Sequence, residues 1–418
     1  MENKIIDHLF RHQFGKMVSI LTRIFGLEHL ETIEDAVQDT FIKALKAWRN
    51  QIPENPEAWL TAAAKNRIID LLRSIKSEKI RKSNYVSGPA TINISELFLE
   101  SEIEDSQLRM IFTACHPILD PREQIAFALK SIAGFNTKEI AKALLSKEET
   151  IKKRLQRART KIANQAISFE IPIGKDIPPR LERVIEVVYL IFTEGFHSFD
   201  KDKAMRTALC GEALRLCKLL LQNQELASSK LYALFALLCF HSSRIESKFG
   251  DDNRIINLKD QVRSKWYLPL MVVGDKAMYQ AMKNEDTLSS YHYEAAIASV
   301  HLKAKRFEDT NWAAILKWYK SLHNLHSTSS NLLNIAIVQL QLNDYESAHT
   351  SLSAIDIKKL SQQVYLFYAT KADYFIKQND LQEAVKNLDV AIEMSPHHSE
   401  VQFLNERRKD YLKNNKVH

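Results

Sequence analysis

Apolar side chains recur at the spacing of one helix face along most of the chain, and this pattern predicts an all-α protein. Three amphipathic helices are expected first: one over residues 5–25, one opened by Thr32 and Asp35, and one that starts at Asn55 and Pro56. Farther along, segments 183–192, 208–221 and 231–240 are apolar around most of their circumference, which predicts buried helices. The chain has 9 glycines and 10 prolines in 418 residues, and this scarcity agrees with a helical fold.

Residues 120–161 predict three short helices, because each has its own start signal. Three pairs have the spacing of a capping box: Asp120 with Glu123, Asn136 with Glu139, and Ser146 with Glu149. Pro121 suits the first position of a helix, and Gly134 suits the end of the first helix. A short helix, a tight turn and a further helix make a helix-turn-helix.

The third of these helices is basic outside its apolar stripe, which consists of Ile151, Leu155, Ala158 and Ile162. A helix fits the major groove of DNA, where Lys and Arg contact phosphates and a few side chains reach base edges. We therefore predict DNA contacts by Thr150, Lys152, Lys153, Arg154, Arg157, Arg159 and Lys161. Base reading is expected of Thr150, Lys153, Arg154 and Arg157. The alternative is a solvated basic face on an ordinary helix.

The net charge of +7 is modest, so the positions of the basic residues carry more information than the total. A second basic surface follows Pro56: Lys65, Arg67, Arg73, Lys76, Lys79, Arg81 and Lys82. The N-terminus lacks the apolar core of a signal peptide, and the longest apolar run, 231–240, is too short to span a bilayer, so a cytoplasmic protein without membrane contacts is expected. Cys115, Cys210, Cys217 and Cys239 have no metal-ligand spacing, which predicts buried apolar side chains and no metal site.

The order of these pieces resembles a bacterial extracytoplasmic-function RNA polymerase sigma factor. Residues 34–48, EDAVQDTFIKALKAW, are similar to the segment of that family that docks on the clamp helices of the largest polymerase subunit. Residues 56–74, PEAWLTAAAKNRIIDLLRS, resemble its helix for opening and reading the minus-ten promoter element. The capped unit at 120–161 resembles its reader of the minus-thirty-five element, and the ordered pair of modules is the specific feature.

The resemblance implies roles for individual residues. Contacts with core RNA polymerase are implied for Asp35, Gln38 and Asp39. Contacts with the minus-ten element are implied for Asn50, Gln51, Asn66, Arg67 and Arg73. Asn50 and Gln51 lie in the loop 49–55, where the family captures an unstacked base, so both double-stranded and single-stranded promoter DNA are implied partners.

These pieces predict four domains or segments. A polymerase-docking and minus-ten domain is expected over residues 1–82, a flexible acidic linker over 83–105, and the helix-turn-helix domain over 106–170. The breaker-rich stretch 171–179 predicts a boundary, followed by a larger helical domain over 178–418. Within it, Asn343-Asp344 recurs as Asn379-Asp380, which predicts tetratricopeptide-like repeats near 329–398, although Gln339 stands where an aromatic residue is expected.

Further motifs extend the resemblance to nearly the whole chain. RMIFTACHPILDP, YLIFTEGF, AAIASVH and DTNWAAI resemble the sigma-factor subgroup with a long helical, tetratricopeptide-like extension. Several residues of the extension are types used in catalysis: Glu194, His197, His241, His292, Glu294, His323 and His326. None has a metal or catalytic spacing, and no glycine-rich phosphate loop is present, so neither an enzyme nor a cofactor is expected. A groove for a regulatory protein or peptide is the better interpretation.

We therefore predict an alternative sigma factor that directs core polymerase to particular promoters and helps to melt them, with a regulatory C-terminal domain. One alternative is a one-component helix-turn-helix regulator whose tetratricopeptide-like domain senses a peptide or small molecule. Another is a tetratricopeptide adaptor whose basic helices hold RNA or acidic proteins. The segment 34–48 before the first basic helix favours the sigma factor, because a simple repressor does not need it.

Overall fold

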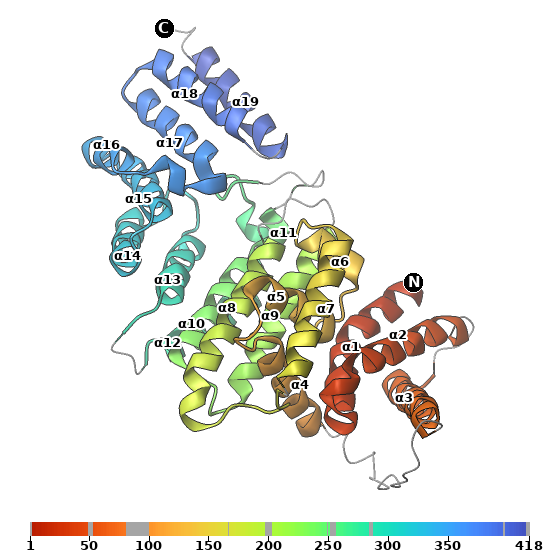
Figure 1. Cartoon of the computed structure of the whole chain (residues 1–418). Coiled ribbons are helices and arrows are strands. Elements are labelled where there is room, and N and C mark those ends of the chain that lie inside the picture. The colour runs from red at the N-terminus through yellow and green to blue at the C-terminus, as the bar shows by residue number, and fades with distance from the viewer. Residues whose placement is uncertain are drawn as a thin grey trace. The chain divides into compact units, whose positions relative to one another are not determined.

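The computed structural model of the chain describes residues 2–48, 53–80, 100–165, 167–196, 203–248, 250, 256–283, 287–395 and 398–414. Throughout these ranges every regular element is a helix, which confirms the all-α prediction (Figure 1). The chain forms two compact units, one of residues 1–198 and 211–226 and the other of residues 199–210 and 227–418. Among the described helices, none is long and apolar enough to cross a membrane.

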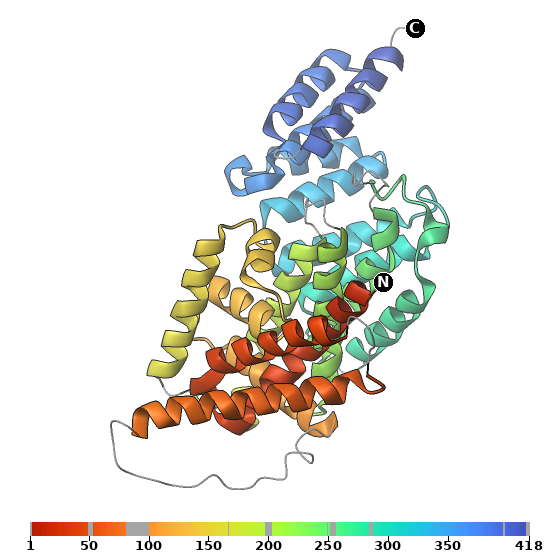
Figure 2. The same ribbon diagram turned by 90° about the vertical axis from the view of Figure 1, so that its right-hand side faces the viewer.

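The first unit begins with three helices that form what we term the first module (Figures 1 and 2). These are α1 (Glu2–Phe25), α2 (Leu30–Ala47) and α3 (Pro56–Ile80), with a short 3-10 turn, η1 (Leu27–His29), before α2. Helix α2 starts at Leu30, two residues before Thr32. Its N-cap residue is His29, whose side chain makes no capping hydrogen bond. The predicted stripe of α2 is confirmed, since Ile33, Val37, Phe41, Ala44 and Trp48 are all buried.

The second module consists of α4 (Glu100–Ala114), α5 (Pro121–Ser131), α6 (Thr137–Ala143), α7 (Glu148–Asn164) and, after η3 (Gly174–Asp176), α8 (Ile177–Phe196). Helix α4 begins at Glu100, so the last six residues of the predicted linker are helical. Residues 81–99 lie outside the described part of the chain.

Helix α8 belongs to the first unit, so the units do not divide at the predicted boundary of 171–179. It packs against α4 and α5, and Arg180 donates a hydrogen bond from Nη2 to the carbonyl oxygen of Phe112 at 2.7 Å. The apolar face of α8, with Val184, Val188 and Ile191 fully buried, covers the helix-turn-helix core. The breaker-rich stretch 171–179 lies between α7 and α8, but it does not end the compact unit. Helix α8 folds back and packs against α4 and α5.

The second unit contains most of the extension. Its helices are α10 (Ser229–Ser243), α11 (Ile245–Lys248), α12 (Leu268–Ala281), α13 (Ser290–Lys303), α14 (Trp312–Leu325), α15 (Ser329–Gln341), α16 (Tyr345–Ser353), α17 (Val364–Lys377), α18 (Leu381–Met394) and α19 (His398–Asn414), with 3-10 turns η4 (Arg263–Lys265), η5 (Ile357–Lys359) and η6 (Ser361–Gln363). Helix α9 (Lys203–Gln222) is shared, since its residues from Gly211 onward count with the first unit.

The repeated sequence of the extension gives a repeated turn. Asn343 and Asn379 both adopt left-handed backbone conformations, with φ of 58° and 60°, between α15 and α16 and between α17 and α18. The next residue caps the following helix in each copy: Asp344 accepts from the Ser347 amide at 3.2 Å, and Asp380 from the Glu383 amide at 3.0 Å. The two helix pairs stack in the blue part of Figure 2.

Gln339 is accommodated in the first copy by a hydrogen bond. It is 95% buried, and its Oε1 accepts from the Ser351 hydroxyl of α16 at 2.8 Å. A buried amide with such a partner avoids most of the desolvation cost, so a polar residue can replace the expected aromatic one.

Candidate nucleic-acid and polymerase interface

The first two helices of the helix-turn-helix start as predicted. Asp120 Oδ1 accepts from the amides of Arg122 and Glu123, both at 3.0 Å, and Glu123 returns the bond to the Asp120 amide at 3.1 Å. Asn136 and Glu139 make the same reciprocal box, with both distances 2.9 Å. These caps satisfy amide donors that a helix start leaves free, so they fix where α5 and α6 begin.

The third predicted capping box is wrong. Helix α7 starts at Glu148 with Lys147 at its N-cap, and no side chain caps it. The reason lies at the end of α6, where Leu145 adopts a φ of 45° and the Ser146 amide donates to the Ala141 carbonyl at 2.8 Å. Ser146 thus lies in the turn that closes α6, one residue before the N-cap position of α7. Glu148 and Glu149 instead place negative charge in the first turn of α7, where the helix dipole favours it.

Helix α7 buries its predicted stripe and presents cations on its other sides. Ile151, Leu155, Ala158 and Ile162 are all at least 95% buried, in agreement with the prediction. Lys152, Lys153 and Arg157 are exposed, whereas Thr150 and Arg154 are half-buried. Lys152 Nζ lies 2.9 Å from Glu149 and 3.4 Å from Glu148, but exposed pairs of this kind hold a side chain weakly. The outer face of α7 is therefore available to a polyanion.

Two of the predicted DNA contacts, Arg159 and Lys161, make ion pairs within the protein. Arg159 donates from Nη1 to Glu31 at 2.9 Å and from Nη2 to Glu34, both on α2. Lys161 Nζ lies 2.6 Å from Glu123 on α5, a carboxylate that is 1% exposed. Glu34 and Glu123 are buried, so the Arg159–Glu34 and Lys161–Glu123 pairs are more costly to break than pairs on the surface. These two cations thus serve packing in this structure, and the predicted cations on the outer face of α7 are Lys152, Lys153, Arg154 and Arg157.

The residues implied in polymerase docking share one side of α2. Asp35 is exposed, while Gln38 and Asp39 are half-buried one turn farther along. Asp39 Oδ2 accepts from Arg67 Nη2 of α3 at 3.2 Å, so the docking side of α2 borders the basic side of α3. Asn66 is exposed beside Arg67. The predicted contacts Asn50 and Gln51, and the side chain of Arg73, lie outside the described residues.

The environment of Asp35 disfavours its negative charge. Partial burial raises its pKa, and repulsion from Glu31 and Glu34 adds to this effect, while Lys130 and Arg159 act in the opposite direction. Lys130 and Arg159 belong to the second module, so Asp35 lies close to the surface where the two modules meet.

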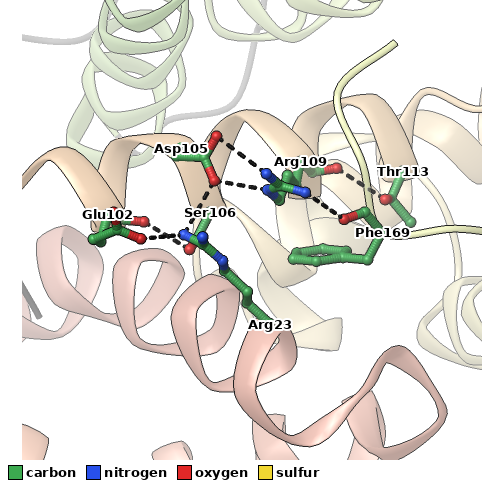
Figure 3. A network of polar contacts seen from close by, with 7 residues as sticks. All are labelled: Arg23, Glu102, Asp105, Ser106, Arg109, Thr113 and Phe169. Carbon is green, nitrogen blue, oxygen red and sulfur yellow. Dashed lines mark hydrogen bonds and ion pairs between the residues drawn. The ribbon is translucent and has the colours of Figure 1, made fainter. Parts of the chain in front are cut away.

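A second polar network joins the modules through α1 and α4 (Figure 3). Arg23 of α1 lies 2.5 Å from Glu102 and 3.1 Å from Asp105, both on α4. Asp105 also accepts from Arg109 at 2.7 Å, and Arg109 donates to the Phe169 carbonyl at 3.2 Å. The acidic residues that looked like a solvated linker therefore hold α4 against α1.

Sequence reasoning missed the contacts between modules, above all Glu34. Its side chain is 1% exposed, and its Oε1 accepts from the Ser131 hydroxyl of α5 at 2.6 Å in addition to the ion pair with Arg159. Glu34 lies four residues after the buried Leu30 and three before the buried Val37, and this helical spacing is the local hint of its burial. Its partners lie 97 and 125 residues away, beyond the reach of any periodicity.

His292 in the extension has neighbours that resemble a serine–histidine pair, but its role is structural. The Ser289 amide donates to Nδ1 of His292 at 3.0 Å, so the proton is on Nε2, which donates to Ser229 Oγ at 2.9 Å. The Ser229 hydroxyl in turn donates to the Ala281 carbonyl at 2.8 Å. This arrangement caps α13 and leaves Ser229 without a base to accept its proton.

Three segments of the chain match family models. Residues 9–78 match sigma-70 region 2, residues 109–162 match sigma-70 region 4, and residues 180–282 match a family of unknown function, DUF6596. The chain also has several relatives among known proteins, and two of them are informative. An uncharacterized protein of Rhizobium meliloti is 30% identical over 90% of this chain and 89% of its own length. The ECF RNA polymerase sigma factor SigE of Mycolicibacterium smegmatis is 26% identical over 37% of this chain and 59% of its own length. No solved structure matches.

Together the paired modules and these matches define a transcription factor of the sigma-70 class. The chain belongs to the extracytoplasmic-function RNA polymerase sigma factors and carries a long C-terminal helical extension. Members of this class bind core RNA polymerase and promoter DNA, and they carry out no chemistry of their own.

Proposed function

We propose that this chain is an alternative sigma factor that docks on the clamp helices of core RNA polymerase through α2 and helps to melt promoter DNA. In this proposal α3 and the loop before it read the minus-ten element, and the outer face of α7 reads the minus-thirty-five element. The protein would work in the cytoplasm, where the polymerase and its promoters are.

One observation carries the proposal: Asp39 of α2 and Arg67 of α3 meet at 3.2 Å. An acidic docking side and a basic reading side thus share one border, so a polymerase bound to α2 would find promoter DNA directly beside it. A one-component regulator needs no such border, and the match of residues 9–78 to sigma-70 region 2 argues against that alternative.

The proposal is tested by runoff transcription with purified core polymerase and by pull-down. We expect the double variant Asp35→Lys, Asp39→Lys to lose polymerase binding and promoter-specific transcripts while it keeps its helical circular dichroism. A matched control is Glu182→Lys, Glu186→Lys on α8, which reverses two exposed acids at the same spacing. Unimpaired polymerase binding by the Asp35 and Asp39 variant, or an equal loss in the control, would contradict docking through α2.

We further propose that the extension regulates initiation, with a positive effect. The segment 180–282 that matches one family model contains α8, which covers the helix-turn-helix core, and also α10 and α12 of the second unit. The second module and the extension are therefore built from one shared segment. The helix pairs α15/α16 and α17/α18 are of a kind that presents a groove to a peptide, which suits a regulatory protein or peptide as partner.

A further inference from the structure

We propose that the outward face of α12 in the second unit is a dimerisation surface, and that its partner is α12 of a second copy of this chain, packed parallel to it about a two-fold axis. This surface lies outside the residues assigned to polymerase and promoter DNA, so its role is independent of the proposed function. Four features of α12 support it: the exposure of this face, the fixed rotation of the helix, the spacing of the apolar side chains and the charges at the two edges.

Exposed apolar side chains are concentrated on α12 and just before it. Of the 15 large apolar side chains that are exposed among the described residues, seven lie in this stretch: Val262, Tyr267, Leu268, Val272, Val273, Tyr279 and Met282. Leu268 is 63% exposed and Tyr279 is 68% exposed. Single exposed apolar residues are common on soluble proteins, but a group of this size on one helix marks an interaction surface.

The opposite face of α12 consists of small residues and packs closely against α10. Gly274, Ala277 and Ala281 are buried, and a methyl group on Gly274 would lie 2.6 Å from the Phe240 ring of α10. This close approach fixes the rotation of α12 about its own axis, so the large apolar side chains cannot turn towards the core. A helix that is apolar on both faces is normally covered on both, and the outward face of α12 is therefore expected to have a partner.

The outward face has the spacing of a seam between two helices. Positions 268, 272, 275, 279 and 282 follow one another at intervals of four, three, four and three residues. Four of these positions are apolar: Leu268, Val272, Tyr279 and Met282. This spacing is the one with which two helices pack along their length. A second copy presents the same stripe, so two-fold symmetry supplies a matching partner.

The charges at the edges of the stripe favour a parallel pair. A helix turns once in 3.6 residues, so Asp275 lies on one edge of the stripe, and Lys276 and Lys283 lie on the other. In a parallel two-fold pair each edge meets the opposite edge of the other helix, which brings Asp275 close to Lys276 of the second copy. An antiparallel pair joins like edges and would place the two Asp275 carboxylates side by side. Asp275 also lies 3.3 Å from Lys303 of its own chain, but both side chains are exposed, and such a pair is weak.

The position of Asp275 also favours a second copy over a membrane surface. An anionic bilayer would attract Lys276 and Lys283, but it would repel the carboxylate in the middle of the seam. A second copy instead supplies a cation for that carboxylate. Two such faces would bury about 1,000 Å² in total, near the lower limit for a specific interface, so we expect a reversible dimer with a Kd of about 1–10 μM.

Sedimentation equilibrium of the full-length chain, at concentrations below and above this Kd, measures the dimer. Val272→Glu places an unpaired charge in the seam and should weaken dimerisation at least about tenfold. Leu325→Glu on α14 is the matched control, because Leu325 is 44% exposed and Val272 is 45% exposed. The control should leave the Kd unchanged, and both variants should keep the helical circular dichroism of the unmodified chain.

Exchange of the edge charges tests the parallel arrangement. Asp275→Lys and Lys276→Asp should each weaken the dimer about fivefold, because attractive contacts between the copies become repulsive. The chain with both substitutions should regain the original Kd. In an antiparallel pair like charges meet before and after each single substitution, so the single variants would leave the Kd unchanged.

Orientation is measured directly with Leu268→Cys under mild oxidation. In the parallel pair Leu268 lies opposite its own counterpart, so a disulfide between the copies should form. In an antiparallel pair it lies opposite Met282, and Leu268→Cys alone would form none. The four native cysteines are buried, and burial raises the pKa of Cys115 and Cys239 to about 12, so they should not compete.

Three results overturn the inference: a full-length chain that stays monomeric throughout this concentration range, a folded Val272→Glu chain that dimerises like the unmodified one, or a disulfide that forms only between Leu268→Cys and Met282→Cys. Binding of a monomeric chain to phosphatidylglycerol vesicles, lost in Val272→Glu and kept in Leu325→Glu, would assign this face to a membrane instead of a second copy.

Discussion

Glu34 on α2 and Arg159 on α7 form an ion pair between residues 125 positions apart, and the carboxylate of Glu34 is 1% exposed. One residue comes from the module that matches sigma-70 region 2, the other from the module that matches region 4. A buried carboxylate depends on its partners, because taking it out of water costs several kcal/mol. The burial of Glu34 therefore depends on a residue of the other module.

The first prediction is that Glu34 and Arg159 are energetically coupled. Arg159→Ala leaves the buried carboxylate with Ser131 as its remaining close partner, so we expect unfolding to become easier by about 1–3 kcal/mol. Glu34→Gln removes the charge that needs Arg159, and the double variant should recover part of the loss. Urea unfolding of the four proteins, followed by circular dichroism, measures the coupling. Strictly additive effects would contradict the burial and pairing described for Glu34.

The second prediction concerns pH and Asp35. Its pKa in the folded protein is raised above the ordinary value of 3.8 by burial and by Glu31 and Glu34. A carboxyl group whose pKa is raised in the folded state stabilises the protein below pH 3.8. This stabilisation is lost as the pH rises through the pKa of the folded state. Asp35→Asn should therefore stabilise the protein at pH 7, by up to about 0.5 kcal/mol for this exposed position. The advantage should shrink as the pH falls from 7 towards 4 in thermal unfolding, and an advantage that grows on acidification would refute the prediction.

The third prediction separates base reading from phosphate contacts on α7. Arg154→Ala or Arg157→Ala should cost about 1–3 kcal/mol of promoter affinity and relax the preference at one position, if the side chain reads a base. Lys152→Ala, at an exposed position outside the expected base readers, should instead weaken binding to all sequences alike and lower the salt slope, as loss of a phosphate contact does. Fluorescence anisotropy with promoter variants at several salt concentrations measures both. Equal, sequence-blind losses from all three would indicate a general basic patch.

Lys161 behaves differently in the same experiment. Its ammonium is the partner of Glu123, which is 1% exposed, so Lys161→Ala should destabilise the helix-turn-helix by about 1–3 kcal/mol. A fall in unfolding free energy identifies this role. A change confined to the salt slope of DNA binding would instead place Lys161 on the phosphate backbone.

The fourth prediction concerns the extension. A chain of residues 1–226 ends with the first unit and keeps α8, so it should fold and bind core polymerase, but we expect it to give fewer runoff transcripts than the full chain. A chain ending at 166 removes α8 from α4 and α5 and should unfold at lower urea concentration than 1–226. Equal transcript yields from 1–226 and the full chain at matched polymerase concentrations would contradict a regulatory role. A higher yield from 1–226 would mean that the extension inhibits initiation.

Local patterns in the sequence determined the helices, their buried faces and several of their ends. The stripe of α7, the caps at Asp120 and Asn136, and the left-handed turns at Asn343 and Asn379 all follow from residues within one or two turns of each other. Such features are set by backbone amides and by helix periodicity, which short segments carry in full. The polar sides of α2, α3 and α7 could be named for the same reason.

Only the tertiary structure decided what covers those surfaces. Periodicity identifies Ile33 as buried, but it cannot show that Glu34 meets Ser131 and Arg159 from helices that begin about 90 and 115 residues later. The same limit explains why α8 joins the first unit. Burial of a charge and packing of a helix depend on groups distant along the chain, because the free energy of a contact depends on position in space.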